Sequence, residues 1–273
     1  MSHSSHTPIA LTIAGSDSGG GAGIQADLKA FSALGAYGAS VITALTAQNT
    51  REVRAIHPVP VPFIRQQLET VFDDLNVNAV KTGMLGDASI VKAVAEFLRG
   101  QPQVKLVVDP VMLSKGGDAL LRADAVSALV SELIPLATLI TPNLPEAAAI
   151  LGCEEPEDLK GMEQMARDLK ALGPDAVLLK GGHLNNSEQS PDIFFDGEQC
   201  ITLNTKRINT KNTHGTGCTL ASAIAALLAK GELPLAAVEQ AKQYISDAIA
   251  VADTLEVGSG HGPVHHFHAF WQH

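Results

Sequence analysis

The chain has 273 residues, of which 45% are hydrophobic and 18% are charged, and its formal net charge is −10. This composition excludes a disordered chain and suits a protein with a large buried core. The acidic balance argues against general binding of nucleic acid, which needs a basic face. No stretch approaches the roughly 20 apolar residues of a membrane-spanning helix, so we expect no membrane partner.

Short apolar segments alternate with amphipathic segments along the chain. We expect strands over 9–14, 38–45, 79–84, 105–108, 138–140 and 176–180, a hairpin from 193–195 and 200–203, and helices over 24–34, 61–75, 88–98, 124–134, 159–172, 219–228 and 235–255. Strands that alternate with helices form a mostly parallel sheet with helices on both faces. Because no linker or internal repeat interrupts the alternation, residues 1–273 are expected to form a single domain, with 1–8 as a disordered tail.

The N-terminal segment and the cysteines indicate a cytoplasmic protein. Residues 1–8 contain neither the basic nor the apolar region of a signal peptide. Cys153, Cys200 and Cys218 are odd in number and far apart, and their spacing matches neither a disulfide framework nor a zinc site. A reducing compartment is therefore expected.

A glycine-rich loop over residues 15–23 joins the first expected strand to the first expected helix. Glycines at such a point allow the backbone to approach a ligand closely. The loop is not a Walker A motif, because no Gly-Lys-Ser/Thr sequence closes it, and its glycine spacing fits the dinucleotide-binding fingerprint poorly. These residues alone leave its ligand open.

A second glycine-spaced turn, residues 212–218, leads directly into the expected helix 219–228. Gly215 and Gly217 permit a tight turn, and the free N–H groups and dipole of the helix start would form an anion site. Cys218 lies on this first turn, where the pKa of a thiol is often lowered. Phosphoryl transfer with a thiol as proton acceptor is one interpretation; an ordinary capped helix with a small buried cysteine is the other.

Polar residues gather where the expected strands end, which is where ligands bind in open α/β sheets. Asp109 and Glu146 offer the carboxylate oxygens that suit magnesium. Lys180 would neutralise a transferring phosphate, and Gln48 can donate to and accept from a heteroaromatic ring. Each residue also has a plainer interpretation: a turn cap for Asp109, an exposed first-turn acid for Glu146, a solvated strand end for Lys180 and a turn residue for Gln48.

Five histidines occur near the C-terminus: His261, His265, His266, His268 and His273. Their spacing matches no closed zinc pattern, and no cysteine lies nearby. We interpret them as packing or surface residues.

The chain resembles the ribokinase-like superfamily, and within it the bacterial hydroxymethylpyrimidine/phosphomethylpyrimidine kinases of thiamine biosynthesis. Colinear motifs carry the resemblance through nearly the whole chain, at residues 10–17, 19–27, 41–50, 81–85, 109–112, 141–147, 180–183, 209–219 and 262–268. It implies a three-layer α/β/α fold with a small flap rather than a full lid domain, and a homodimer. It also implies an enzyme that uses ATP and Mg²⁺ to phosphorylate 4-amino-5-hydroxymethyl-2-methylpyrimidine and then its monophosphate.

Site residues follow from the resemblance by matching motif positions. It implies a pyrimidine site of Gly15, Asp27, Gln48, Met84 and Val111, magnesium ligands Asp109 and Glu146, ATP contacts from Asn143, Lys180 and Thr213, and an anion hole of Gly215, Thr216 and Gly217. Cys218 stands where most ribokinase-like sugar kinases have an aspartate base, a departure that the pyrimidine kinases and some pyridoxal kinases share.

Two alternatives remain open at this point. A pyridoxal/pyridoxine kinase would use the same fold on another hydroxymethylated ring, and a non-catalytic relative would only bind a ligand. The presence of Asp109, Glu146, Lys180 and Cys218 together argues against the second. The paired glycines of residues 114–118 make that segment our candidate for the flap.

Overall fold

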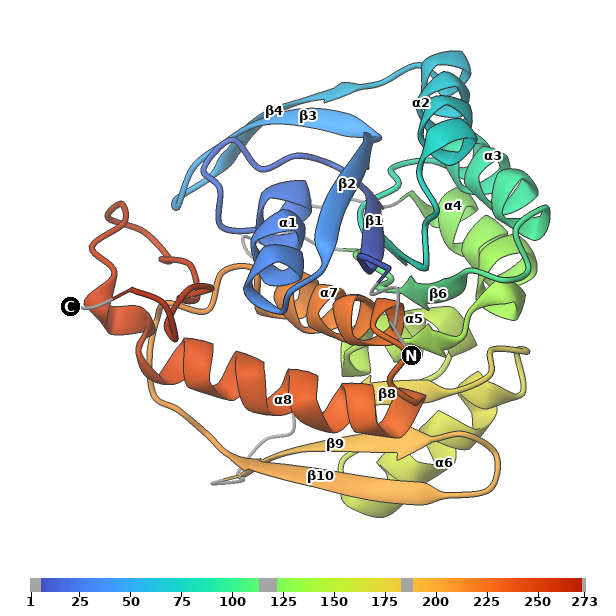
Figure 1. The fold of residues 1–273 in the computed structure, drawn as a ribbon. Coiled ribbons are helices and arrows are strands. Elements are labelled where there is room, and N and C mark those ends of the chain that lie inside the picture. Colours follow the sequence, from blue (N-terminus) through green and yellow to red (C-terminus); the bar gives the residue numbers. More distant parts are fainter. Residues whose placement is uncertain (1–5, 113–121, 183–188, 272–273) are drawn as a thin grey trace, which may run out of the picture.

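A central sheet organises the computed structural model, which describes residues 6–112, 122–182 and 189–271 (Figure 1). Its strands follow the order β10-β9-β8-β7-β6-β5-β1-β2. They are β1 (Ile9–Ala14), β2 (Tyr37–Ile42), β5 (Ala79–Thr82), β6 (Lys105–Val108), β7 (Leu139–Ile140), β8 (Val177–Lys180), β9 (Gln189–Phe195) and β10 (Cys200–Lys206). All neighbours from β2 to β8 are parallel, and β9 and β10 add an antiparallel hairpin. The mostly parallel sheet is therefore confirmed.

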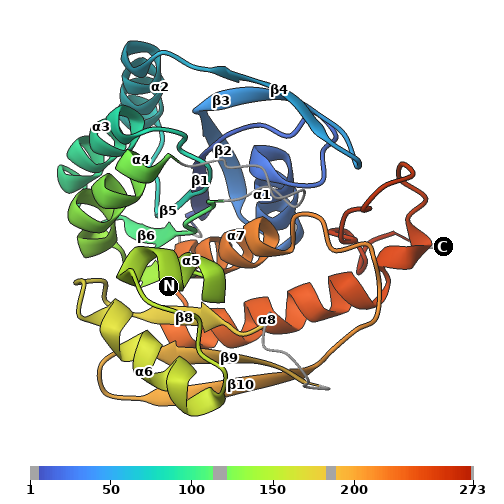
Figure 2. The ribbon, with the colours of Figure 1, turned by 180° about the vertical axis from the view of Figure 1, so that it is seen from behind.

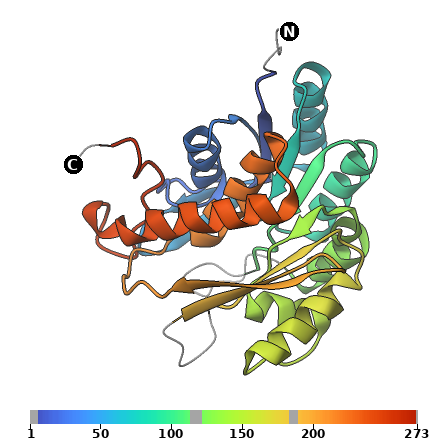
Figure 3. The same cartoon turned by 60° about the horizontal axis from the view of Figure 1, so that its bottom comes forward.

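Helices cover both faces of the sheet. One face carries α2 (Val61–Asp74), α3 (Ala88–Arg99), α4 (Ala123–Ala128), α5 (Leu144–Leu151) and α6 (Leu159–Lys170); the other carries α1 (Gly23–Ala33), α7 (Thr216–Ala229) and α8 (Pro234–Ala250) (Figures 1 and 2). Side chains alternate along a strand, so Leu11 and Ile13 face the first layer while Ala10 faces the second. Figure 3 shows the β9–β10 hairpin between α6 and α8 at one edge. The predicted three-layer α/β/α fold is confirmed.

Residues 38–45 do not form one strand, and that prediction is wrong. The chain leaves the sheet at Thr43, whose N–H donates to the Ala14 carbonyl and whose hydroxyl donates to the Met84 carbonyl. It continues as β3 (Ala44–Gln48), which pairs with β4 (Val53–Pro58) in a separate antiparallel ribbon. The apolar run in the sequence crosses this corner without a break, so hydrophobicity alone did not locate the turn.

Other differences are local. Helix α5 was not predicted, although Asn143 and Glu146 form a capping box that starts it. The expected helix 124–134 is α4 followed by a π-helical turn, Leu129–Leu133, and a 3-10 turn, Ile134–Leu136. Helix α8 ends at Ala250, before the 3-10 turn Ala252–Thr254.

The described helices include none that is both long and apolar enough to cross a membrane. The candidate flap, residues 114–118, lies outside the described residues.

Candidate active site

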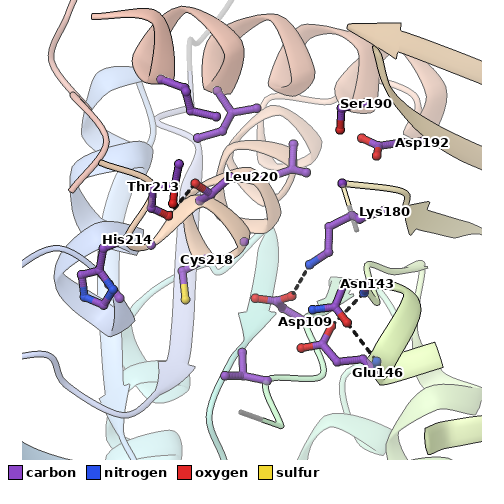
Figure 4. Close-up of a pocket in the computed structure, with 18 of the residues that line it drawn as sticks. Asp109, Asn143, Glu146, Lys180, Ser190, Asp192, Thr213, His214, Cys218 and Leu220 are labelled. Carbon is purple, nitrogen blue, oxygen red and sulfur yellow. Dashed lines mark hydrogen bonds and ion pairs between the residues drawn. The ribbon is translucent and has the colours of Figure 1, made fainter. Parts of the chain in front are cut away.

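A cavity of about 1730 Å³ opens at the carboxyl ends of the parallel strands, next to the start of α7 (Figure 4). Of the residues singled out by sequence, it is lined by Gly15, Gln48, Met84, Asp109, Val111, Asn143, Glu146, Lys180, Thr213, Gly215, Thr216, Gly217 and Cys218. Residues from all along the chain thus meet here, because parallel strands present their carboxyl ends at one edge. Asp27 is the exception and does not line the cavity.

Gly215 positions the start of α7. Its φ of +79° is left-handed, and a Cβ there would lie 1.9 Å from the carbonyl oxygen of Gly21. Only glycine allows this approach, so the turn before α7 packs directly on the glycine-rich loop that follows β1. At the other side of that loop, Gly15 makes room for Met84, whose methyl carbon lies 2.3 Å from where a Cβ would be.

Positive charge concentrates at the N-terminus of α7. In the described part of the chain, the backbone amides of Gly217 and Cys218 have no hydrogen-bond acceptor. The ammonium of Lys180 lies close by, 3.4 Å from the position of a Cβ on Gly217. Free amides, the helix dipole and a lysine together make a site for an anion such as phosphate.

Lys180 is held by an ion pair with Asp109. Its Nζ lies 3.2 Å from Asp109 Oδ1, which also accepts a hydrogen bond of 3.2 Å from the Thr141 hydroxyl. Burial lowers the pKa of Lys180, but the carboxylates of Asp109 and Glu146 outweigh this and raise it overall. The lysine is therefore charged at neutral pH, and the solvated strand-end interpretation is wrong.

Glu146 is buried rather than exposed, so its interpretation as an exposed first-turn acid is also wrong. Its carboxylate accepts from the Asn143 N–H at 2.8 Å, and Asn143 Oδ1 accepts from the Glu146 N–H at 2.9 Å. Burial raises the pKa of Glu146 to about 7; Lys180 counteracts this, while repulsion from Asp109 adds to it. The cap thus holds a buried carboxyl whose charge is compensated in part by Lys180.

Asp109 and Glu146 fit a magnesium ion in their chemistry. The described residues contain no cluster of three or more His, Cys, Asp or Glu side chains arranged to hold a metal. The two carboxylates lie beside each other at the cavity wall (Figure 4). Magnesium usually binds through one or two carboxylates together with waters and substrate phosphates, so this open pair suits it.

The prediction that the helix start lowers the pKa of Cys218 is wrong. Burial raises the pKa of this thiol to about 11, and the opposing effect of the Lys81 ammonium is smaller. Asp27 and Asp109 raise this pKa further, and a hydrogen bond with the Gly23 backbone lowers it. Desolvation of a thiolate outweighs the favourable helix terminus here, a balance that depends on neighbours distant in sequence.

Asp27 lies behind the cavity wall in a fully buried ion pair. Lys81 Nζ lies 2.9 Å from Asp27 Oδ1, and the hydroxyls of Thr12 and Ser222 each donate to Asp27 at 2.6 Å. With no exposed surface, Asp27 has no face open to a ligand, and the predicted contact with substrate gives way to a contact with Lys81, which does line the cavity. Lys81 was missed, although a lysine inside an apolar strand signals a buried partner.

Further lining residues were not singled out by sequence. Asp17 and His214 lie beside Gln48, and the ion pair of Lys242 with Asp192 lies at the opposite end of the cavity with Ser190. Nothing in their local sequence separates them from surface residues, because their partners come from other elements.

The packing interpretation of the C-terminal histidines is confirmed for His265 and His266, which are buried. His266 Nε2 lies 3.0 Å from the Thr219 hydroxyl. Burial lowers the pKa of His266 to about 3, so it is neutral and secures the C-terminal segment against α7.

Alkylation of Cys218 in the free protein is expected to be slow at pH 7 and to rise about tenfold per pH unit up to pH 10. The reason is that only the thiolate reacts, and it forms as the pH approaches the raised pKa. Iodoacetamide labelling followed by peptide mass spectrometry measures the rate, with the exposed Cys153 as internal reference. Equal labelling of Cys218 at pH 7 and pH 9 would contradict the raised pKa.

Comparison with known proteins places this geometry in a family. A model of the phosphomethylpyrimidine kinase family matches residues 17–265. The hydroxymethylpyrimidine/phosphomethylpyrimidine kinases of Rhizobium meliloti strain 1021 and Escherichia coli strain K12 are each 55% identical to this chain, over 97% and 96% of it and 99% and 98% of the relatives. The solved pyridoxal kinase of Staphylococcus aureus in complex with ADP has a TM-score of 0.89 and 35% identity, over 97% of this chain and 95% of that one.

Fold and site define a ribokinase-like kinase, in which one sheet edge brings an anion site, a lysine and a carboxylate pair together. The solved relative with bound ADP supports nucleotide binding by this fold. The chain belongs to the phosphomethylpyrimidine kinase family. The prediction of a phosphotransferase is thereby confirmed. A thiamine biosynthesis bifunctional protein of Geobacter sulfurreducens is 54% identical over 94% of this chain and 51% of that relative, which confirms the predicted role in thiamine biosynthesis.

Proposed function

We propose that this chain transfers the γ-phosphate of ATP to 4-amino-5-hydroxymethyl-2-methylpyrimidine and then phosphorylates the resulting monophosphate. The observation that carries the proposal is the arrangement of Cys218 and the free amides of α7 beside the Lys180–Asp109 pair in one cavity. Family membership supports the choice of substrate. The three free cysteines accord with the cytoplasmic location that we propose.

The cavity residues divide between the two substrates. Gly15, Gln48, Met84 and Val111 would bind the pyrimidine, and Asn143, Lys180 and Thr213 would bind ATP. The turn of Gly215, Thr216 and Gly217 would hold the transferred phosphate, with the free amides of Gly217 and Cys218 as donors, because the Thr216 amide already donates to the Thr213 carbonyl at 3.3 Å. Asp109 and Glu146 would hold Mg²⁺, which supplies further neutralisation of the triphosphate when bound. Phosphoryl transfer depends mainly on such positioning and charge stabilisation.

Cys218 would accept the proton of the hydroxymethyl group as its oxygen attacks. In the free protein the raised pKa keeps this thiol protonated at neutral pH. The base role therefore requires that the bound complex lowers the pKa, and the cations that act on Cys218 are Lys81 and Lys180. The proposed mechanism therefore requires these two lysines to stabilise the Cys218 thiolate in the bound complex.

Product analysis tests the function. The protein is incubated with ATP, Mg²⁺ and either hydroxymethylpyrimidine or pyridoxal, and the phosphates added are counted by mass spectrometry. We expect two phosphates on the pyrimidine, with no turnover when EDTA removes Mg²⁺. Failure to phosphorylate the pyrimidine, or arrest at the monophosphate, would refute the proposal.

A pyridoxal kinase is the second candidate. The pyridoxal kinase of Staphylococcus aureus shares the fold over nearly the whole chain, and pyridoxal also presents a hydroxymethyl group on a heteroaromatic ring. A single phosphate on pyridoxal, with no product from the pyrimidine, would favour this candidate.

We propose that the protein is a homodimer formed through the β3–β4 ribbon. Leu45 and Ile56 are 48% and 44% exposed and lie in adjacent cross-strand pairs, on opposite faces of the ribbon. An isolated two-stranded ribbon is only marginally stable in water, and a second copy packed on the Leu45 face would cover that side chain. In light scattering, wild type should have twice the mass of one chain and Leu45→Asp should shift toward one. The control is Leu233→Asp, at an exposed site between α7 and α8; a monomeric wild type would contradict the proposal.

A further inference from the structure

Three polar side chains from different segments meet at the pyrimidine end of the cavity. Asp17 lies in the loop after β1, Gln48 ends β3, and His214 precedes α7. His214 Nε2 lies 2.8 Å from Asp17 Oδ2 and 3.4 Å from Gln48 Nε2. One ring nitrogen thus faces both a carboxylate and a carboxamide.

Asp17 is an acceptor in this cluster. Besides His214, its carboxylate accepts from the backbone amides of Gly19, Gly21 and Ala22 at 2.8, 3.0 and 2.8 Å. Burial raises the pKa of Asp17, but the hydrogen bond and charge of His214 and the amides of Ala22 and Gly19 outweigh it and lower the pKa overall. An ionised carboxylate only accepts hydrogen bonds, so His214 Nε2 must carry a hydrogen and donate it.

The hydrogen on His214 Nε2 decides which end of the Gln48 carboxamide faces the ring. With Gln48 Nε2 toward His214, two donors face each other, an arrangement that forms no hydrogen bond. A 180° turn of the carboxamide keeps its shape and brings Oε1 to His214.

Thr46 supports the same orientation from the other side. The Thr46 hydroxyl oxygen lies 3.3 Å from the terminal carboxamide atom of Gln48 that does not face His214. The same hydroxyl donates its hydrogen to the Ser16 carbonyl at 2.9 Å. The Thr46 oxygen therefore has lone pairs left to accept from the Gln48 NH₂ group. In the turned orientation Gln48 Oε1 can share the His214 Nε2 hydrogen with Asp17, and the Gln48 NH₂ group donates to Thr46.

We propose that His214, backed by Asp17, is a positioning residue that fixes the polarity of Gln48 and thereby selects an aminopyrimidine edge. Gln48 offers its oxygen beside His214 and an N–H beside Thr46, in one fixed sense. An exocyclic amino group next to a ring nitrogen acceptor complements this pattern. A pyrimidinone, with a carbonyl next to a ring N–H, presents the reverse pattern. The inference rests on the proposed pyrimidine kinase function and names the residues that distinguish an aminopyrimidine from a pyrimidinone in its ring site.

The test compares two substrates that differ only in this pattern: 4-amino-5-hydroxymethyl-2-methylpyrimidine and the corresponding 4-pyrimidinone. Dissociation constants come from calorimetry, and kcat/KM comes from the first phosphorylation. We expect wild type to prefer the amino compound by about 10²-fold or more, since a polar site rejects mismatched hydrogen-bonding groups strongly. In His214→Phe, only Thr46 still orients Gln48, and the preference should fall at least about tenfold.

Thr46 provides a second, independent variant pair. Thr46→Val removes the acceptor and should also reduce the preference, whereas Thr46→Ser keeps the hydroxyl and should retain it. His6→Phe, at an exposed position, is the matched control for His214→Phe.

The preference ratio separates positioning from a merely structural role. A merely structural role would weaken the binding and turnover of both compounds equally. An unchanged preference ratio in both His214→Phe and Thr46→Val overturns the inference. If wild type phosphorylates the amino compound and both variants keep the wild-type preference for it over the pyrimidinone, the inference about His214 fails and the proposed kinase function stands. If wild type neither binds nor phosphorylates either pyrimidine, the proposed function fails and the inference fails with it.

Discussion

Replacement of Cys218 by alanine is expected to lower kcat of the first phosphorylation by roughly 10²-fold or more, the usual contribution of a general base. The second phosphorylation should fall by less than about tenfold. The two steps differ in their nucleophile. The hydroxymethyl group must lose a proton as it attacks, whereas the phosphate of the monophosphate is already ionised at neutral pH.

The ATP site should be little affected by this substitution. The amides of α7 and the Lys180–Asp109 pair do not depend on the thiol, so KM for ATP should stay within about threefold of wild type. Cys218→Ser should not restore the rate, because a hydroxyl is a weaker base than a thiolate. Steady-state assays with each pyrimidine as sole acceptor measure both steps.

The control is Cys153→Ala, which removes an exposed cysteine and should leave both steps unchanged. Equal losses in the two phosphorylations would contradict a base role for Cys218. Such a result would instead favour Cys218 as a packing residue that shapes the start of α7.

Lys81→Met is expected to reduce the free energy of unfolding by roughly 3–5 kcal/mol, as breaking a buried ion pair usually does. Both side chains of the Lys81–Asp27 pair are fully buried. Without the ammonium, Asp27 keeps only the hydroxyl donors of Thr12 and Ser222 in a site that excludes water. The melting temperature should fall by roughly 6–20 °C for a chain of this size.

Denaturant unfolding of the single and double variants tests whether the pair is coupled. Lys81→Met combined with Asp27→Asn removes both charges, and this double variant should be more stable than Lys81→Met alone. Arg54→Met breaks an exposed ion pair with Glu52 and should cost less than about 1 kcal/mol. Additive losses in the double variant would show that Lys81 and Asp27 do not stabilise each other.

The sheet and the location of the site were largely predictable because both depend on local patterns. Alternating apolar segments identified β1, β5, β6 and β8 to within about two residues at each end. Polar residues that end such strands must meet at one edge, which brought Asp109 and Lys180 into one cavity. The corner at Thr43 was not predictable in this way, since it is made by contacts with Ala14 and Met84.

The sequence by itself determined the order of the strands and helices apart from the β3–β4 ribbon and α5, the glycine that α7 needs at Gly215, and membership of a kinase family. Periodicity, backbone sterics and motif order are properties of short stretches of chain. Only the tertiary structure decided that Asp27 pairs with Lys81, that burial raises the pKa of Cys218 to about 11, and that His214 lies between Asp17 and Gln48. Desolvation and ion pairing depend on which distant residues surround a group, and folding alone brings those residues together.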